Sequence, residues 1–131
     1  NTTKVAQFLK NHSKAEWVNY AGLSDHPDNG LVQKYMGGRA SGIINFGVKS
    51  TDGDGKAAGA RFQDALKLVT RLVNIGDCKS LACHPASTTH RQLSENELAK
   101  AGVSADMVRL SIGIEHIDDI LDDLDQALAA V

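Results

Sequence analysis

One arginine stands in an apolar setting near the C-terminal end of the chain. Arg109 lies in the run VRLSIGIE at positions 108–115, whose apolar and polar residues alternate as they do on a strand. An arginine held on a strand can bind a carboxylate through two parallel hydrogen bonds, which the ammonium of a lysine cannot match. By residue type alone, an arginine on a sheet is more often a solvated surface residue. Arg109 is therefore a candidate carboxylate-binding residue that needs further support.

A second run, DCKSLACHPASTTH at positions 77–90, holds several side chains that can take part in chemistry. Ser80 is a single serine on an expected short strand, where a serine is usually structural. His84 and His90 flank a turn that contains proline, and metal ligation would need further donors nearby, of which there are none. We therefore predict that these histidines fix the loop. Cys78 and Cys83 have no evident base partner, which predicts a loop thiol and a core residue rather than nucleophiles.

The composition is ordinary for one globular domain. The chain has 131 residues, of which 42% are apolar and 23% charged, enough for a core of its own. Its net charge of −2 argues against a nucleic-acid partner, which usually needs a clustered basic face. No apolar run approaches about 18 residues, so we expect no membrane partner. The two cysteines indicate a reduced, intracellular protein rather than a disulfide framework, which predicts a cytoplasmic location.

Apolar periodicity and turn residues predict four strands and five helices. Strands are expected at residues 17–20, 42–49, 80–84 and 108–113. Helices are expected at the N-terminus with Thr2 and Thr3 as caps, at 31–36, at 56–73, from the capping box of Ser94 and Glu97 to near Gly102, and from Ile117 to Leu128. The run TDGDG at 51–55 lacks the later ligands of a calcium loop and predicts a turn.

Some gaps between these strands are too short for parallel crossovers. We therefore predict an α+β fold, a small and mostly antiparallel sheet with helices packed on one face. Alternation along the strands predicts the residues that face the helices, which are Ile44, Phe46, Val48, Leu81, Cys83, Val108, Leu110 and Ile112. The opposite face is expected to carry Ile43, Asn45, Ser80, Ala82, Arg109 and Ser111. The aspartates of the last helix are expected to fall away from its apolar stripe: Asp118, Asp119, Asp122, Asp123 and Asp125.

The runs DCKSLACHPASTTH and VRLSIGIE together resemble the C-terminal domain of the Cys/Met-metabolism family of pyridoxal-phosphate (PLP) enzymes. In that family, the arginine of an RLSxGxE-like motif holds the α-carboxylate of the amino-acid substrate, and the motif stands here at 109–115. The resemblance therefore implies a substrate-binding role for Arg109 and places Ser80 near the same carboxylate. It implies no catalytic, cofactor-binding or metal-binding residue within this chain.

Within the family, Lys79 and the run HPASTTH resemble the sulfhydrylase branch, which converts O-acetylhomoserine and sulfide into homocysteine and acetate. A cystathionine γ-synthase or γ-lyase domain and a free-standing interaction module with an α+β fold are the alternatives. The resemblance covers residues 1–131 and implies the C-terminal part of a longer enzyme, inactive on its own. The lysine that forms the Schiff base with PLP would lie in a large preceding domain, and the whole enzyme would be a homo-oligomer.

Overall fold

One five-stranded sheet organises the part of the chain that the structure describes. The computed structural model describes residues 1–131 apart from the side chain at position 95. The strands are β1 (Ala15–Asn19), β2 (Ile43–Val48), β3 (Thr70–Arg71), β4 (Leu81–Cys83) and β5 (Met107–Ser111). They lie in the order β1-β2-β5-β4-β3, and neighbours run antiparallel except β3 and β4, which are parallel. The predicted small, mostly antiparallel sheet is therefore confirmed.

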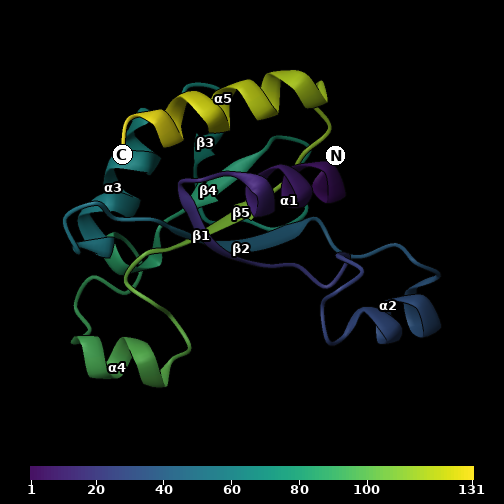
Figure 1. The fold of residues 1–131 in the computed structure, drawn as a ribbon, viewed down its shortest axis with the longest axis horizontal. Coiled ribbons are helices and arrows are strands. Elements are labelled where there is room, and N and C mark those ends of the chain that lie inside the picture. Colours follow the sequence, from purple (N-terminus) through teal and green to yellow (C-terminus); the bar gives the residue numbers. More distant parts are fainter.

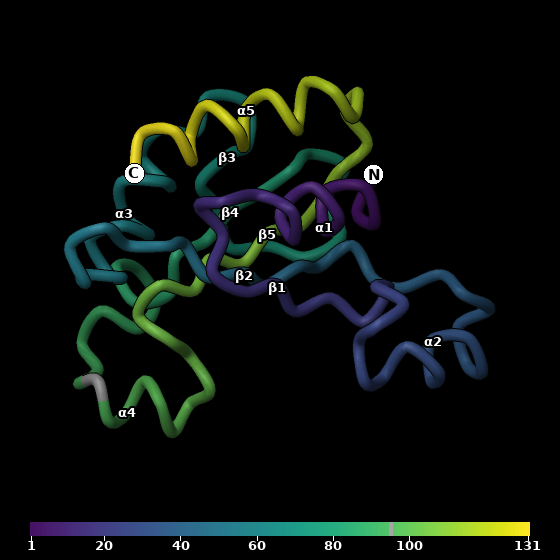
Figure 2. The backbone as a smooth tube through the Cα atoms, viewed as in Figure 1, coloured from purple at the N-terminus to yellow at the C-terminus, as the bar shows by residue number. Residues whose placement is uncertain are grey.

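Three helices cover one face of this sheet (Figure 1). The helices are α1 (Thr2–Asn11), α2 (Asn29–Met36), α3 (Gly55–Ala65), α4 (Glu95–Lys100) and α5 (Ile117–Ala129). Helices α1 and α3 each pack against α5 and against β2. By contrast, α2 and α4 lie apart from this layer, at two separate places below the sheet in the backbone trace (Figure 2). Among the described residues, no helix is long and apolar enough to cross a membrane.

The apolar faces of β2, β5 and the covering helices meet in one core. Ile44 and Phe46 of β2 pair with Leu110 and Val108 of β5, and all four side chains are fully buried. Phe46 also packs edge-to-face on Phe62 of α3, with the ring centroids 5.4 Å apart. Helix α5 adds residues at helical spacing, namely Ile120, Leu124, Ala127 and Leu128. Full burial of such large side chains stabilises the fold by roughly 1.5–3 kcal/mol each, so the core holds β5 firmly in place.

The third helix is shorter than its apolar pattern predicts. Instead of a helix over residues 56–73, α3 ends at Ala65 and a short strand forms at 70–71. The cause is Asp123 of α5, whose carboxylate accepts hydrogen bonds from the backbone N–H groups of Lys67, Leu68 and Val69 at 2.9–3.0 Å. These donors are then not available to continue the helix. Asp123 is buried, so the expectation that it falls away from the apolar stripe is wrong.

Strand β4 presents its side chains to the opposite faces from those predicted. Ala82 pairs with Leu110, whereas Cys83 pairs with Arg109. Directly paired residues share a face of the sheet, so Ala82 points into the core and Leu81 and Cys83 lie on the other face. The short run Leu-Ala-Cys contains no polar residue, so its sequence does not distinguish the two faces.

One of the predicted helix caps is confirmed and another is wrong. The Glu97 carboxylate accepts hydrogen bonds from the N–H and the hydroxyl of Ser94, both at 2.8 Å, which confirms the capping box of α4. Gly37 follows α2 with a φ of 58°, the left-handed conformation that favours glycine. At the N-terminus, however, α1 already includes Thr2 and Thr3, so neither threonine is its cap.

Candidate functional site

Arg109 lies on the face of the sheet that α1, α3 and α5 leave open. Its neighbours Val108 and Leu110 point into the core, so the Arg109 side chain points the other way. It is partly buried, and among the described residues its guanidinium has no hydrogen-bond or ion-pair partner; the arginine ion pairs involve Arg61 and Arg71 instead. A guanidinium carries five N–H donors in a rigid planar fork. Arg109 therefore presents all its donors to a ligand on this face.

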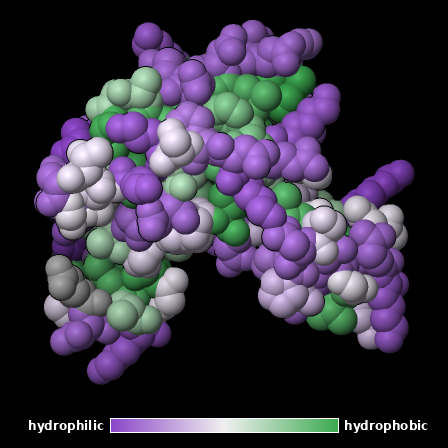
Figure 3. Space-filling view, viewed as in Figure 1, coloured by the Kyte–Doolittle hydropathy of each residue, from purple (hydrophilic) through white to green (hydrophobic). Residues whose placement is uncertain are grey.

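A row of side chains crosses the sheet at the level of Arg109. Asn45 of β2 lies directly opposite Arg109 on one side, and Cys83 of β4 lies opposite it on the other. Asn19 of β1 extends the row beyond Asn45. In the space-filling view, the molecule is hollowed on the side of the sheet away from α1 and α5, between the parts formed by α4 and α2 (Figure 3). The row thus places one cation among small polar groups on a concave side of the molecule.

Ser80 and Glu115 form a hydrogen-bond network where β4 begins and β5 has ended. The Ser80 hydroxyl donates to Glu115 Oε2 at 2.8 Å and accepts from the Gly113 N–H at 2.9 Å, while the Ser80 N–H donates to Glu115 Oε1 at 2.5 Å. Partial burial raises the pKa of Glu115, but the hydrogen bonds from Ser80 and from the backbone of Glu115 itself together outweigh this effect and hold the pKa below its ordinary value. The Ser80 carbonyl accepts from the Thr70 N–H at 3.0 Å. Ser80 is fully buried, so its polar groups join segments of this chain.

Gly113 allows the two sequence runs to approach each other closely. A Cβ atom at Gly113 would lie 2.3 Å from the carbonyl oxygen of Cys78 and 2.6 Å from the carbonyl carbon of Lys79. Both are backbone atoms, so no side-chain movement could relieve the clash. The Ile114 N–H then donates to the Cys78 carbonyl at 3.0 Å. Gly113 and Glu115 therefore have structural roles in the RLSIGIE motif, because they bind the segment that carries Ser80.

His84 fixes the turn after β4, as predicted. Its ring is buried, with Nε2 2.8 Å from the Ala105 carbonyl oxygen and Nδ1 2.7 Å from the Ser87 hydroxyl. The carbonyl can only accept, so Nε2 donates to it and the neutral ring accepts the Ser87 hydroxyl at Nδ1. Burial lowers the pKa of His84, although the hydrogen bond to Ala105 acts in the opposite direction. Cys78 is an exposed free thiol, as predicted for a loop; Cys83 is a buried free thiol, but on the face of the sheet opposite to the predicted one.

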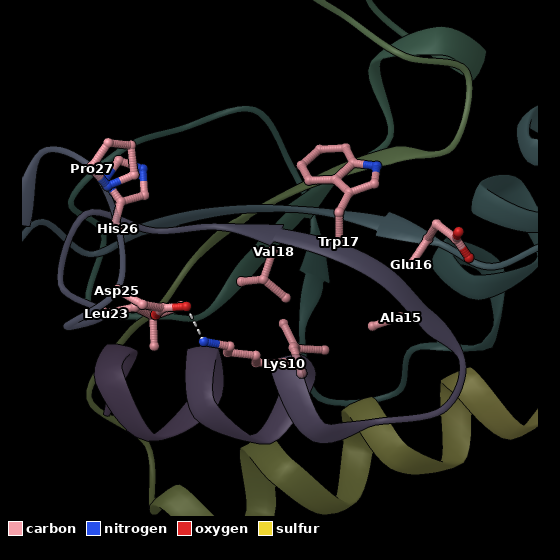
Figure 4. Close-up of a pocket in the computed structure, with 10 residues that line it drawn as sticks. Lys10, Ala15, Glu16, Trp17, Val18, Leu23, Asp25, His26 and Pro27 are labelled. Carbon is pink, nitrogen blue, oxygen red and sulfur yellow. Dashed lines mark hydrogen bonds and ion pairs between the residues drawn. The ribbon is translucent and has the colours of Figure 1, made fainter.

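The described residues contain no metal site, and the pocket beside α1 offers no free cation to a carboxylate. No group of three or more His, Cys, Asp and Glu side chains in the described part of the chain could hold a metal ion. A pocket of about 320 Å³ lies between α1 and β1 (Figure 4). Leu9 and Val18 line its apolar part, and the Lys10 ammonium pairs across it with Asp25. The hydrogen bond from Lys10 lowers the pKa of Asp25, so this pocket contains a cation that is already neutralised.

The fold and the site together define a small α+β domain in which Arg109, partly buried and without a partner among the described residues, suits a carboxylate ligand. A family model described as "Cys/Met metabolism PLP-dependent enzyme" matches residues 1–129. The chain belongs to this family of PLP-dependent enzymes.

Individual relatives agree with this assignment. O-acetyl-L-homoserine sulfhydrylase 1 of Thermus thermophilus is 47% identical over 129 residues, which is 98% of this chain and 30% of that protein. O-acetyl-L-homoserine sulfhydrylase of Leptospira meyeri is 50% identical over 129 residues, 98% of this chain and 28% of that protein. A crystal structure of an O-acetylhomoserine (thiol)-lyase from Campylobacter jejuni, which contains a pyridoxyl-lysine monophosphate, matches with a TM-score of 0.85 and 42% identity over 98% of this chain and 30% of that one. The chain therefore spans about 30% of the length of these relatives.

The lysines of this chain do not fit the role of the PLP anchor. PLP enzymes bind the cofactor through a lysine Schiff base in a site closed to water. One lysine, Lys14, is partly buried and donates to the Val131 carbonyl oxygen at 2.6 Å. The others are exposed, namely Lys4, Lys10, Lys34, Lys49, Lys56, Lys67, Lys79 and Lys100. Arg109, in contrast, is a partly buried cation without a partner among the described residues, which suits a carboxylate ligand.

Two residues of this region make contacts that their positions in the sequence did not reveal. Glu115 belongs to the motif, and its network with Ser80 depends on segments 35 positions apart. Asn45 was placed on the correct face by alternation, but its pairing with Arg109 depends on the register of β2 and β5. In both cases the missing information is a long-range pairing, which strand alternation does not encode.

Proposed function

We propose that this chain is the substrate-carboxylate-binding part of a PLP-dependent sulfhydrylase that converts O-acetylhomoserine and sulfide into homocysteine and acetate. The observation that carries the proposal is the unpaired Arg109 beside Asn45 and Cys83 on the concave side. The names of the Thermus thermophilus and Leptospira meyeri relatives support the choice of substrate. In the whole enzyme, bound PLP supplies the electron sink for the chemistry.

Arg109 binds and orients the substrate in this proposal. Its guanidinium donates two parallel N–H bonds to the two oxygens of the α-carboxylate, which fixes the direction of the amino acid as well as its position. Ser80 serves the same site as a positioning residue. Its hydrogen bonds to Glu115 and Gly113 hold the start of β4 against the end of β5, which carries Arg109.

The remainder of the enzyme lies in the length of the relatives that this chain does not span. We place the Schiff-base lysine and the phosphate site of PLP in a large domain that precedes this C-terminal part, and we expect the whole protein to be a homo-oligomer. A cytoplasmic location agrees with the exposed free thiol of Cys78, because such thiols persist in reducing compartments.

A related branch of the family provides the second candidate function. A cystathionine γ-synthase or γ-lyase would use the same arginine for the same carboxylate, so Arg109 does not separate the branches. The sulfhydrylase branch is supported by relatives with that name and by the homocysteine synthase of Schizosaccharomyces pombe, 41% identical over 128 residues. Homocysteine formation by the full-length enzyme should therefore depend on sulfide. Activity with cystathionine alone would instead assign the lyase branch.

Substitution of Arg109 in the full-length enzyme tests the proposal. Arg109→Ala should raise KM for O-acetylhomoserine and lower kcat/KM by roughly 2–4 kcal/mol equivalent, the usual cost of losing a desolvated charge-assisted contact. Arg109→Lys should restore only part of the loss, because an ammonium lacks the planar fork. The cofactor content, read from its absorbance, should stay normal in both variants, because PLP is bound elsewhere.

A matched control is available on the covered side of the sheet. Arg61 belongs to α3, is exposed and lies 3.7 Å from Asp52, so Arg61→Ala removes an arginine without touching the face of Arg109. It should leave the steady-state kinetics unchanged. Unaltered KM and kcat/KM for O-acetylhomoserine in Arg109→Ala would remove the basis of the proposed function.

A further inference from the structure

Asn45 contains a buried polar atom that the fold does not satisfy. Its side-chain oxygen Oδ1 is shielded from solvent and accepts no hydrogen bond within the described part of the chain. A buried acceptor without a donor is costly, because it has lost its bonds to water and gained none in return. The Asn45 oxygen therefore needs a donor that the described residues do not provide in this structure.

Two side chains of the same row can reach Asn45. Directly paired residues on adjacent antiparallel strands have Cβ atoms about 4.5–5.5 Å apart, and Asn45 pairs with Asn19 on one side and Arg109 on the other. The Asn19 side chain is exposed, and its oxygen lies 2.9 Å from Nε2 of His26, so it is held toward the turn after β1. On the other side stands a guanidinium with five donors, no acceptor of its own and no partner among the described residues.

The complementary groups are therefore Asn45 and Arg109. Cys83, which flanks Arg109 on β4, provides only a weak sulfur acceptor and already lies 3.5 Å from the Thr88 hydroxyl. The Asn45 oxygen is thus the one strong acceptor that the sheet itself presents beside Arg109 in the row defined by the described strands. A guanidinium can donate two N–H bonds to a carboxylate and still donate another to a neighbouring amide oxygen.

We propose that Asn45 is a positioning residue of the substrate site: its Oδ1 accepts an N–H of Arg109 when the fork binds the substrate carboxylate. This inference rests on the carboxylate-binding role proposed above for Arg109. The bond to Asn45 fixes the plane of the guanidinium. Two parallel N–H groups on another edge of the guanidinium then face the two oxygens of the carboxylate. Asn45 does not touch the substrate. The bond to Asn45 offsets part of the conformational freedom that Arg109 loses on binding and favours the orientation that suits a planar, two-oxygen group.

The test is a double-mutant cycle in the full-length enzyme, with O-acetylhomoserine as the probe. Asn45→Ala should raise KM for O-acetylhomoserine about five- to twentyfold with little change in kcat, the loss expected for one hydrogen bond to a charged donor. In an Arg109→Ala background, the same substitution should change KM less than twofold, because the partner of Asn45 is gone. Asn45→Thr, which keeps a side-chain acceptor and suits a strand, should recover part of the loss.

A second substrate and a matched control separate positioning from folding. The carboxamide of O-acetylhomoserine has no carboxylate for the fork, so its KM should not respond to Asn45→Ala. Asn19→Ala removes the other amide of the row and should leave KM for O-acetylhomoserine unchanged. The melting temperature of Asn45→Ala should not fall below that of the parent enzyme, because the lost oxygen has no partner in the fold.

The outcomes distinguish this inference from the proposed function. An equal rise in KM from Asn45→Ala in the parent and in the Arg109→Ala background would overturn the positioning role, and so would an unchanged KM in the parent. Both results leave the role of Arg109 standing if Arg109→Ala itself raises KM. If Arg109→Ala has no effect on KM, the proposed function fails, and the inference about Asn45 fails with it.

Discussion

Replacing Asp123 by alanine removes the acceptor that three consecutive backbone N–H groups share. The donors belong to Lys67, Leu68 and Val69, in the segment that follows α3. The Val69 donor is buried, whereas Lys67 and Leu68 are exposed, so water can replace the carboxylate for two of the three. Gln126 also loses a bond to Asp123 but keeps its 2.7 Å bond to the Ala65 carbonyl. The substitution should therefore leave one buried donor without a partner.

The expected loss of stability follows from these three donors. A buried N–H without a partner costs about 2 kcal/mol, and the two exposed donors together lose about 1 kcal/mol when water replaces a charged acceptor. Asp123→Ala should thus lower the free energy of unfolding by about 3 kcal/mol. Asp123→Asn keeps one acceptor oxygen, but it loses the charge and presents an amide NH₂ to the same donors, so its loss should be intermediate.

Urea unfolding of the chain measures this effect. Trp17 is the single tryptophan, so its fluorescence and the far-ultraviolet circular dichroism provide two independent signals. With an m value of about 1.5 kcal/mol/M, a loss of about 3 kcal/mol moves the midpoint down by about 2 M. Asp122→Ala is the matched control, because Asp122 neighbours Asp123 on the same helix and is exposed. Equal midpoints for Asp123→Ala and Asp122→Ala would refute the argument that Asp123 ends α3.

Three further perturbations concern the hydrogen-bond networks, and each is measured by urea unfolding. Glu115→Gln turns one acceptor of Ser80 into a donor and should cost about 1–3 kcal/mol at pH 7; no loss would show the network to be incidental. Gly59→Ala places a Cβ 2.4 Å from Nε2 of the buried His84 and should cost about 1–3 kcal/mol, whereas Gly30→Ala, with open space around it, should cost little. Because burial lowers the pKa of His84 in the folded state, its stabilising effect is complete above the ordinary value of 6.5 and decreases as pH falls through 6.5 toward the lowered pKa. His84→Gln should be less stable and should lose this part of the pH dependence; an identical pH profile would contradict the assignment.

The fold was predictable wherever a single segment carries its own pattern. Strand β2 alternates apolar and polar residues, so its bounds and its inward face follow from positions 42–49 alone. Helix α5 repeats its apolar residues at helical spacing and was predicted equally well. Strand β4 contains only small or apolar residues, so no local signal separates its faces. The end of α3 depends on Asp123, 56 positions from Lys67, which no local pattern includes.

The candidate site likewise combines features that follow from a local sequence pattern with features that depend on long-range contacts. Local alternation places Arg109 on the open face of β5, but its carboxylate-binding role was implied only by the resemblance to the family of PLP enzymes. The hydrogen bonds of Ser80 depend on Glu115, 35 positions away, and the place of Ser80 near the substrate carboxylate stays a prediction. The link between Asn45 and Arg109 depends on how β2 and β5 are aligned. An alternating strand therefore shows which face a residue occupies more readily than which residues of other strands lie beside it.

The RLSIGIE motif separates structural residues from a residue that the fold does not use. Leu110 is buried in the core, Gly113 makes room for the backbone of Cys78, and Glu115 binds Ser80. Each of these residues has a partner in this chain, so replacing it should lower stability whether or not a ligand is present. A structural arginine that is partly buried would be expected to have an acceptor too, because five N–H donors are costly to leave without partners. Arg109 has none among the described residues, which supports the proposal that this arginine binds a ligand on the open face of the sheet.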